Sequence, residues 1–258
     1  MRRTHFPPPA ILTALLLLLA GCTPSNHPDP NDPQFIVDQA IAAHGGNVLD
    51  NALLEFDYRG KHFIATRNNG LFSYERLYAD STGDVREVLT NDDVFKEVNG
   101  ERVEITEKRR YIIQETNNSV VYFGFLPYFL NDPAVKKKYI GSTTIGGEPY
   151  QEVEITFSAE NGGPDYEDRF VFWFHADNHT MDYLAYDFLI NDGGTRFREA
   201  FNIRTIEGVR VADYKNYKSE VIPKPGAPIE DYEQLIGKEE LVLLSEINLE
   251  NVKISRLE

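Results

Sequence analysis

The amino-acid sequence predicts a mainly β protein of the α+β class, built on a single curved antiparallel sheet, or open β half-barrel, of about eleven strands. Three observations predict this fold class. Apolar and polar residues alternate along much of the chain. Turns rich in asparagine and glycine separate the alternating segments. Strands and helices do not alternate as βαβ units require. We expect an N-terminal helix and a helical insert to cover the concave face.

Residues 1–21 have the composition of a lipoprotein signal peptide. Arg2 and Arg3 precede an apolar run over residues 10–20, which is too short to span a bilayer. The next residues, Leu19-Ala20-Gly21-Cys22, resemble a lipobox, and Cys22 is the only cysteine of the chain. We therefore expect lipid on Cys22, a flexible tether over residues 22–33, and no disulfide or free thiol in the mature protein.

The predicted anchor and the charge limit the partners of the mature protein. Thr23 after the cysteine, in place of aspartate, implies the outer membrane under enteric-type sorting, with the protein facing the periplasm. The net charge of −15 becomes more negative when the two signal arginines are removed. Such a surface repels phosphates, which argues against nucleic acid as a partner. We expect the membrane as a partner through the lipid anchor, and no cofactor.

We expect the folded domain to span residues 34–258. Its first half begins with a helix. Apolar residues recur at helical spacing from Phe35 to Ala43, and Gly45-Gly46 supplies a stop. Period-two alternation follows, and Asn69-Gly70 and Asn99-Gly100 are strong hairpin signals. We expect strands at residues 52–59, 61–67, 70–79, 84–90, 93–98 and 101–106.

The segment of residues 118–131 interrupts the strand pattern. Its apolar residues lie at helical spacing, and Pro127 has no N–H for the helical hydrogen-bond ladder. We expect two helical turns, broken near the proline, as the helical insert. Further strands are expected at residues 149–158, 167–175, 180–190, 195–206 and 209–220. A C-terminal extension over residues 221–258 should contain a proline-rich link, a short helix near 229–236 and a last strand within 239–256.

Several stretches carry a resemblance to known proteins. Residues 36–46 (IVDQAIAAHGG) resemble the opening helix of outer-membrane lipoprotein-sorting proteins of the LolA and LppX type. Residues 125–130, 145–150, 181–186 and 196–204 resemble a family of uncharacterised bacterial lipoproteins. The resemblance implies an open half-barrel that holds acyl chains beneath helical lids, and it implies no catalytic residues. Lipidation at Cys22 departs from a soluble carrier and puts shuttling between membranes in doubt.

Two apolar groups are candidates for lining a ligand cavity. One lies in the insert and consists of Val121, Phe125, Leu126 and Phe129. These side chains either line a lipid pocket or plug the barrel as core, and the pattern favours the plug. The other is the strand 169–175, which includes Trp173 and is apolar on both faces. We expect this strand to be covered on both sides, and ordinary core is its favoured interpretation.

Polar residues on two neighbouring strands form a third candidate. Asp182 and Tyr186 share strand parity, as do Arg196 and Arg198 across the turn at residues 192–194. The arginines either grip the anionic headgroup of a ligand or form a cross-strand salt bridge on a solvated face. The strand pattern favours the bridge.

Metal and catalytic motifs receive little support. His175, Asp177 and His179 have a spacing that zinc can use, but the same residues are ordinary loop composition and no further ligand is identifiable. His44 reads as a helix-end residue stabilised by the helix dipole. No nucleophile elbow, zinc-protease motif or phosphate loop is present.

The sequence thus predicts a membrane-anchored envelope lipoprotein that binds an apolar or amphipathic ligand, such as a lipid or acyl chain, in a half-barrel cavity without catalysis. The alternative is a structural or protein-interaction module of the envelope with a fully packed core. An enzyme acting on envelope polymers, with paired carboxylates in a cleft, is a third class that the abundant acidic residues leave open.

Overall fold

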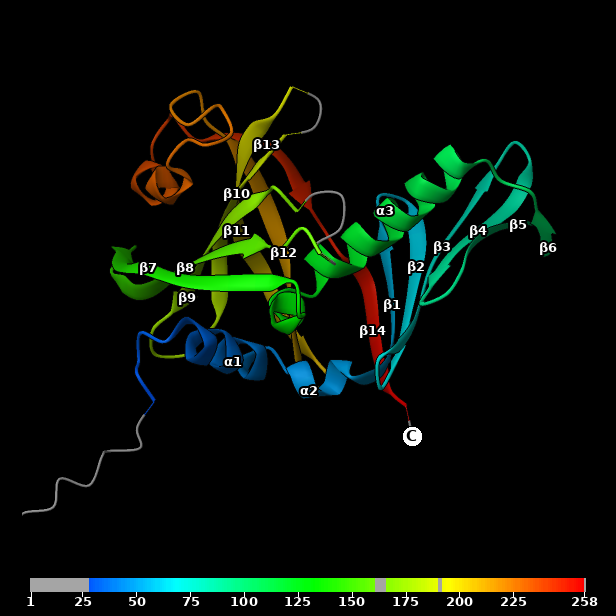
Figure 1. Ribbon diagram of the computed structural model, residues 1–258, viewed down its shortest axis with the longest axis horizontal. Helices are drawn as coiled ribbons and strands as arrows, with labels where there is room; N and C mark the ends of the chain where they lie inside the picture. Colours follow the sequence, from blue (N-terminus) through cyan, green and yellow to red (C-terminus); the bar gives the residue numbers. More distant parts are fainter. Residues whose placement is uncertain (1–27, 161–165, 190–191, 258) are drawn as a thin grey trace, which may run out of the picture.

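The computed structural model describes residues 28–160, 166–189 and 192–257, and these form two antiparallel sheets side by side (Figure 1). Cys22 and the signal segment lie outside the described residues. In spatial order, sheet A consists of β14 (Glu250–Arg256), β1 (Asn51–Tyr58), β2 (Lys61–Asn68), β3 (Leu71–Asp80), β4 (Gly83–Thr90), β5 (Val94–Val98) and β6 (Glu101–Val103). Sheet B consists of β13 (Val242–Ile247), β12 (Val209–Lys218), β11 (Gly194–Ile206), β10 (Met181–Phe188), β9 (Arg169–His175), β8 (Glu148–Phe157) and β7 (Val135–Ile145).

The mainly β class and the antiparallel pairing are confirmed, but the single sheet of about eleven strands is not. In the described ranges each sheet has seven strands. The expected last strand is two strands: β13 pairs with β12 of sheet B, and β14 pairs with β1 of sheet A. Only residues 248–249 separate them. The sheets therefore meet where one segment of chain passes from the edge of sheet B to the edge of sheet A. Residues 135–145, for which the sequence analysis predicted no strand, form β7.

The N-terminal helix is confirmed as α1 (Pro33–Ala43). Asp32 caps it, because its carboxylate accepts a hydrogen bond from the N–H of Gln34 at 3.0 Å. The helix ends at His44, and Gly45 follows with a φ of 76°. A Cβ at Gly45 would lie 2.2 Å from the carbonyl oxygen of Gly208, so glycine is required there by both conformation and space. The short helix α2 (Gly46–Leu49) then leads into β1.

The helical insert is longer than predicted. α3 (Glu107–Gly124) starts at Thr106, whose hydroxyl accepts a hydrogen bond from the N–H of Arg109 at 3.3 Å. It runs obliquely across sheet A (Figure 1), and a short 3-10 helix, η1 (Tyr128–Asn131), follows. On the buried face of α3, Asn117 is 0 % exposed and donates to the backbone oxygens of Tyr74 and Glu87, both at 3.0 Å. These bonds fasten α3 to two strands of sheet A.

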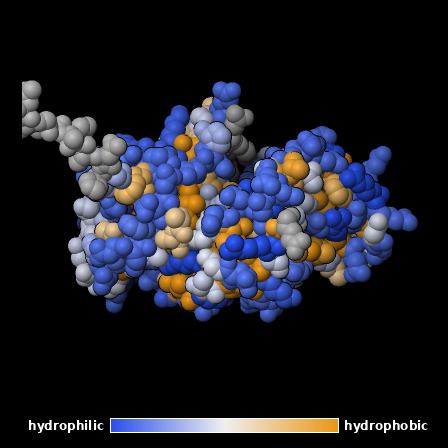
Figure 2. All heavy atoms as spheres, turned by 90° about the horizontal axis from the view of Figure 1, so that it is seen from below, coloured by the Kyte–Doolittle hydropathy of each residue, from blue (hydrophilic) through white to orange (hydrophobic). Residues whose placement is uncertain are grey.

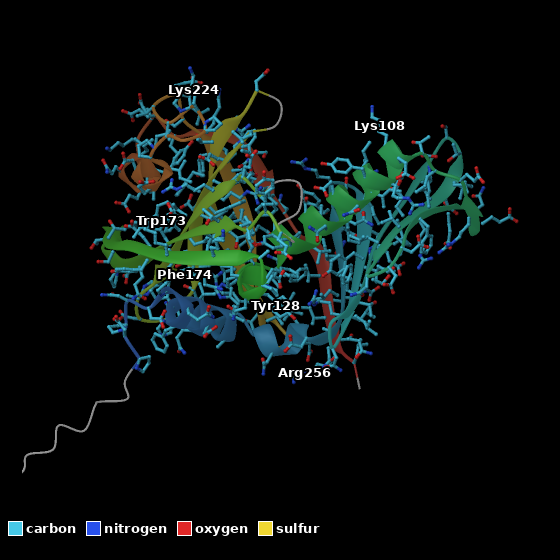
Figure 3. The ribbon with its side chains drawn as sticks, viewed as in Figure 1. Lys108, Tyr128, Trp173, Phe174, Lys224 and Arg256 are labelled. Carbon is cyan, nitrogen blue, oxygen red and sulfur yellow. The ribbon has the colours of Figure 1, made fainter. Side chains whose placement is uncertain are left out.

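Three apolar clusters fill the fold. The first lies between sheet A and α3. The second lies between one face of sheet B, α1 and the segment that follows α3. The third lies on the other face of sheet B, beneath residues 221–241 and their 3-10 helix η2 (Ile229–Leu235). Trp173 and Phe174, adjacent on β9 (Figure 3), belong to the third and second clusters respectively, so the predicted two-sided burial of this strand is confirmed.

The outer surface is largely polar. Figure 2 shows one face on which hydrophilic residues predominate and hydrophobic residues gather in small groups. No helix among the described residues is both long enough and apolar enough to span a membrane.

Candidate functional site

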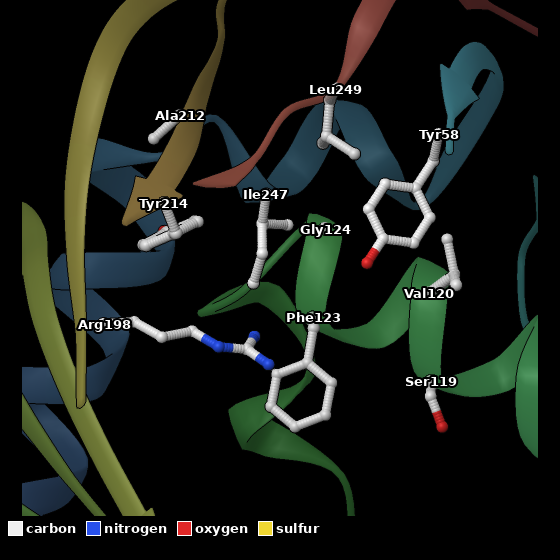
Figure 4. Close-up of a pocket in the computed structure, with 10 residues that line it drawn as sticks. All are labelled: Tyr58, Ser119, Val120, Phe123, Gly124, Arg198, Ala212, Tyr214, Ile247 and Leu249. Atoms are coloured by element: carbon white, nitrogen blue, oxygen red, sulfur yellow. The ribbon is translucent and has the colours of Figure 1, made fainter. Parts of the chain in front are cut away.

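An apolar pocket of about 220 Å³ lies where the two sheets meet (Figure 4). Its walls come from the C-terminal half of α3, from β11 and β12, from the last residues of β1 and β13, and from Leu249 in the segment that joins β13 to β14. The lining residues are Tyr58, Ser119, Val120, Phe123, Gly124, Arg198, Ala212, Tyr214, Ile247 and Leu249. We refer to it as the junction pocket.

The phase of α3 decides which of its side chains reach the junction pocket. Ile113, Asn117 and Val121 recur every four residues and are buried against sheet A. The neighbouring stripe, which includes Val120 and Phe123, is turned toward sheet B and lines the pocket. The bonds of Asn117 to sheet A therefore also fix the pocket wall.

Arg198 is the one arginine or lysine among the lining residues. Its Nη2 donates to the Tyr186 hydroxyl at 3.1 Å, and its guanidinium carbon lies 4.6 Å from the centre of the Phe123 ring and 5.2 Å from that of Tyr186. Figure 4 shows the guanidinium beside Phe123. Its Nε is buried without a hydrogen-bond partner, and no described carboxylate forms an ion pair with Arg198. The pocket therefore holds a cation stabilised by two aromatic rings and by no counter-charge.

The other polar lining group near Arg198 is neutral. Burial raises the pKa of Tyr214 to about 12, although the charges of Arg210 and Arg198 oppose the rise. The Tyr214 hydroxyl therefore stays protonated at physiological pH, and Arg198 carries the charge of the pocket.

The structure places the four predicted insert residues in the core. Val121, Phe125 and Phe129 belong to the cluster beneath α3, and Leu126 belongs to the cluster on sheet B. Each is at most 6 % exposed, and none lines the junction pocket. Their neighbours Val120, Phe123 and Gly124 line it instead.

Among the other predicted residues, Tyr186 and Arg198 are brought together. Arg196 lies apart from them, with its guanidinium over the Phe188 ring at 4.9 Å and its Nη1 donating to the Thr195 carbonyl oxygen at 2.7 Å. Trp173 is 0 % exposed beneath residues 221–241, on the other face of sheet B.

The carboxylate of Asp182 does not meet Arg196 or Arg198. It forms an ion pair with Arg210 at 2.7 Å and accepts a hydrogen bond from the Tyr150 hydroxyl at 3.0 Å. The cross-strand bridge that the sequence favours is therefore not formed, because the partner of Asp182 is an arginine of β12, two strands away in sheet B.

Most of the pocket residues carry no recognisable signal in the sequence. Tyr58, Ile247 and Leu249 come from strand ends nearly two hundred residues apart, and only the meeting of the sheets brings them together. Phe123 had a usable signal, because it shares a helical stripe with Ser119 and Val120 once α3 is extended toward its N-terminus.

The histidines hold structural positions. His175 Nε2 lies 3.3 Å from Glu148, and its Nδ1 accepts the N–H of Asp177 at 3.2 Å, while His179 has a φ of 60° in the turn. In the described part of the chain no group of three or more His, Cys, Asp or Glu residues is placed to hold a metal.

His44 is held by hydrogen bonds rather than by its charge. Burial, helped by the charge of Arg210, lowers the pKa of His44 to about 4. Its Nδ1 donates to the Ala40 carbonyl oxygen at 2.8 Å, while Nε2 accepts from the N–H of Met181 at 3.4 Å. The neutral ring therefore joins α1 to sheet B, and dipole stabilisation of a charged histidine does not apply.

Several solved structures are similar to this chain at low identity. A LolA superfamily protein from Nitrosomonas europaea has 11% identity and a TM-score of 0.45, over 88% of this chain and 93% of that one. A putative outer membrane lipoprotein-sorting protein domain from Vibrio parahaemolyticus has 8% identity and a TM-score of 0.41, over 81% and 99%. The lipoprotein LppX of Mycobacterium tuberculosis has 15% identity and a TM-score of 0.28, over 63% and 91%.

The resemblance to this group is confirmed by these neighbours, but at such TM-scores they carry nothing about ligand or partner. No curated protein matches the chain. One family model matches residues 17–249, which is most of the sequence. The chain belongs to that family, DUF6503, a family of unknown function.

Proposed function

We propose that this chain is a lipid-anchored protein of the bacterial envelope that binds a small amphipathic anion, such as a fatty acid, in the junction pocket without catalysing a reaction. The observation that carries the proposal is Arg198, a cation in an apolar pocket with no ion-pair partner among the described residues. Withdrawing a charge from water is costly unless the charge is paired. A ligand carboxylate beside the guanidinium would supply the missing counter-charge.

The walls of the pocket are suited to the apolar part of such a ligand. Phe123, Val120, Ile247 and Leu249 present ring and aliphatic surface. Burying an acyl chain against them contributes roughly 25 cal/mol for each Å² removed from water. Arginine matches a carboxylate in bidentate geometry, so Arg198 would fix which end of the chain enters.

The pocket volume limits the size of the ligand. About 220 Å³ is below the ~300 Å³ at which ordinary ligand sites begin. Beneath the insert, Phe125 and Phe129 belong to the first apolar cluster, and Phe129 also lines a separate, more polar pocket of about 460 Å³. The junction pocket therefore suits a short acyl chain, or one end of a longer chain whose remainder lies outside.

The anchor is proposed on the sequence alone. Lipid on Cys22 would hold the protein at the outer membrane, facing the periplasm. The first described residues follow the surface of sheet B, where Gln151 Nε2 donates to the Pro30 carbonyl oxygen at 2.7 Å. The tether would therefore leave the fold beside β8.

The test measures uptake of acyl compounds by purified residues 23–258. Octanoate, dodecanoate and octanol are compared by native mass spectrometry and by displacement of a fluorescent fatty acid. We expect octanoate to bind and octanol to bind more weakly, because the alcohol carries no charge for Arg198. Absence of uptake by a folded sample would remove the proposal.

Two variants assign the binding to the pocket. Arg198→Met keeps an apolar stem but loses the charge, and should weaken octanoate binding roughly 10- to 100-fold, the range expected for a charge-assisted hydrogen bond. Arg196→Met is the matched control, since its guanidinium lies over Phe188 outside the pocket. Equal binding by both variants would contradict the assigned site.

A second candidate function, an interaction module of the envelope, is favoured by a different observation. Three consecutive apolar side chains of the edge strand β13, those of Val242, Leu243 and Leu244, are exposed by 43–49 %. Exposed apolar side chains along a strand edge are typical of protein contacts. A folded protein that takes up no acyl compound but binds a partner through β13 would establish this function instead.

A further inference from the structure

Residues 221–241 form a strap across the outer face of sheet B. Ile229 and Tyr232 of η2 are 0 % exposed against the third apolar cluster, and Arg169 on β9 forms an ion pair with Glu230 at 2.9 Å. Beneath the strap, Trp173 Nε1 donates to the Glu233 carboxylate at 3.0 Å. The strap is therefore held by apolar contacts and by a small number of polar ones.

Two acidic residues face the same space beneath the strap. Glu152 on β8 is 9 % exposed and is paired across the strands with Trp173 of β9, whose Nε1 donates to Glu233 of the strap. Two ionised carboxylates in such a place repel each other and cannot hydrogen-bond to one another, because neither has a proton to donate. A proton on one of the two groups removes the repulsion and allows the bond.

Neighbouring elements provide no cation to replace that proton. On β9, Arg169 is bound to Glu230 and, at 2.6 Å, to Glu154. On β7, Lys138 lies 3.8 Å from Glu154, and the residue paired with Glu152 is Gly141. On the strap, Glu230 adds further negative charge. Among the described residues, no lysine or arginine forms an ion pair with Glu152 or Glu233.

We propose that Glu152 and Glu233 form a proton-binding site, in which one shared proton fastens the strap to sheet B and its release at higher pH loosens the strap. The environment of Glu152 determines the direction of this pH dependence. Burial raises the pKa of Glu152 to about 7, with a further contribution from the charge of Glu233. The native state thus binds this proton more tightly than the unfolded chain does. The strap contact is favoured below the native pKa and weakens as the pH rises through it.

The chain contains its own reporter for this site. Trp173 is the only tryptophan of the sequence, and it donates directly to Glu233. The tryptophan emission and its quenching by acrylamide are measured on the full-length protein between about pH 5 and pH 9. We expect a red shift and a rise in quenching as the pH increases, with a midpoint of about 7.

Variants separate this site from the other carboxylates. Glu152→Gln retains a hydrogen-bond donor to Glu233 at every pH. The emission shift and the rise in quenching should therefore both be lost, and the variant should show the low-pH emission and quenching at every pH. Glu154→Gln is the matched control, because it makes the same charge change on the same face of β8 and should keep the transition. Glu233→Gln should behave as Glu152→Gln does, and covers the case in which the first variant does not fold.

The outcomes are decisive. An emission that does not change with pH, or a transition that persists in both Glu152→Gln and Glu233→Gln, would overturn the proton site. An emission shift without a rise in quenching would overturn the fastening of the strap. The inference is independent of ligand binding, since the strap and the junction pocket lie on opposite faces of sheet B.

Discussion

Asp213 on β12 accepts a hydrogen bond from the backbone N–H of Leu249 at 3.0 Å, at the point where the chain passes from sheet B to sheet A. Arg204 of β11 completes the contact: it forms an ion pair with Asp213 at 3.1 Å and donates to the Leu249 carbonyl oxygen. The two side chains therefore hold the link between β13 and β14 through both of its backbone groups.

Removal of Asp213 should destabilise the whole protein. In Asp213→Ala, Arg204 and the Leu249 N–H lose their partner in a buried place, which costs about 3 kcal/mol of unfolding free energy. Urea unfolding measures the loss, and Glu246→Ala, an exposed change on β13, is the control. A loss of less than about 1 kcal/mol would show that the link is held by other contacts.

Phenylalanines on the two sides of the α3 segment should respond differently to truncation. Phe125→Ala and Phe129→Ala each remove a ring from the first apolar cluster, and each should cost about 3–5 kcal/mol of stability. Phe123→Ala removes a partly exposed pocket wall, so its stability loss should be smaller and its octanoate affinity lower. Denaturation and binding curves for the three variants test this, and similar stability losses in all three would contradict it.

His44 should make stability depend on pH in the acidic range. Because its native pKa is lowered to about 4 from an ordinary value of 6.5, the unfolded chain binds the proton more readily. Its stabilising contribution is present above pH 6.5 and is lost as the pH falls toward 4, by roughly 2–4 kcal/mol in total.

The measurement compares unfolding free energies of the wild type and His44→Gln at several pH values. Glu152 acts in the opposite direction over an overlapping range, so the difference between the two proteins isolates His44. An unchanged pH slope in the variant would show that His44 is not the titrating group.

Cys22→Ala should release the protein from membranes. Without the acylation site the protein cannot receive the lipid that is proposed to hold it at the membrane. Fractionation of cells and labelling with palmitate should both show complete loss of the membrane-bound form. A variant that stays in the membrane fraction and keeps its label would contradict lipidation at Cys22.

Local signals in the sequence predicted most of the elements. α1 begins after the cap residue Asp32 and ends before Gly45, and the sequence shows both limits because helix caps and stops depend on neighbouring residues only. Asn69-Gly70 and Asn99-Gly100 adopt positive φ in their turns, so the hairpins formed where expected. The short helix near residues 229–236 is present as η2.

The features that the sequence did not predict depend on contacts between residues that are distant in the sequence. The early turns of α3 escaped prediction because Asn117, fully buried among backbone acceptors of sheet A, breaks the apolar spacing of the helix. The division of the last strand at residues 248–249 depends on which strands lie on either side. The junction pocket depends in turn on that division. Of its lining residues the sequence analysis singled out Arg198, which is bonded to the predicted Tyr186, and the helical stripe of α3 held a signal for Phe123.

The pairing of β14 with β1 has a consequence for how the protein acquires its structure. Leu54 of the first strand meets Ile254 of the last, so the two sheets are completed only by residues near the end of the described chain. Contacts this distant in sequence form late and slowly. During synthesis the N-terminal strands would remain open at one edge until the C-terminal strand has been made, so neither sheet is complete before the last part of the described chain has left the ribosome.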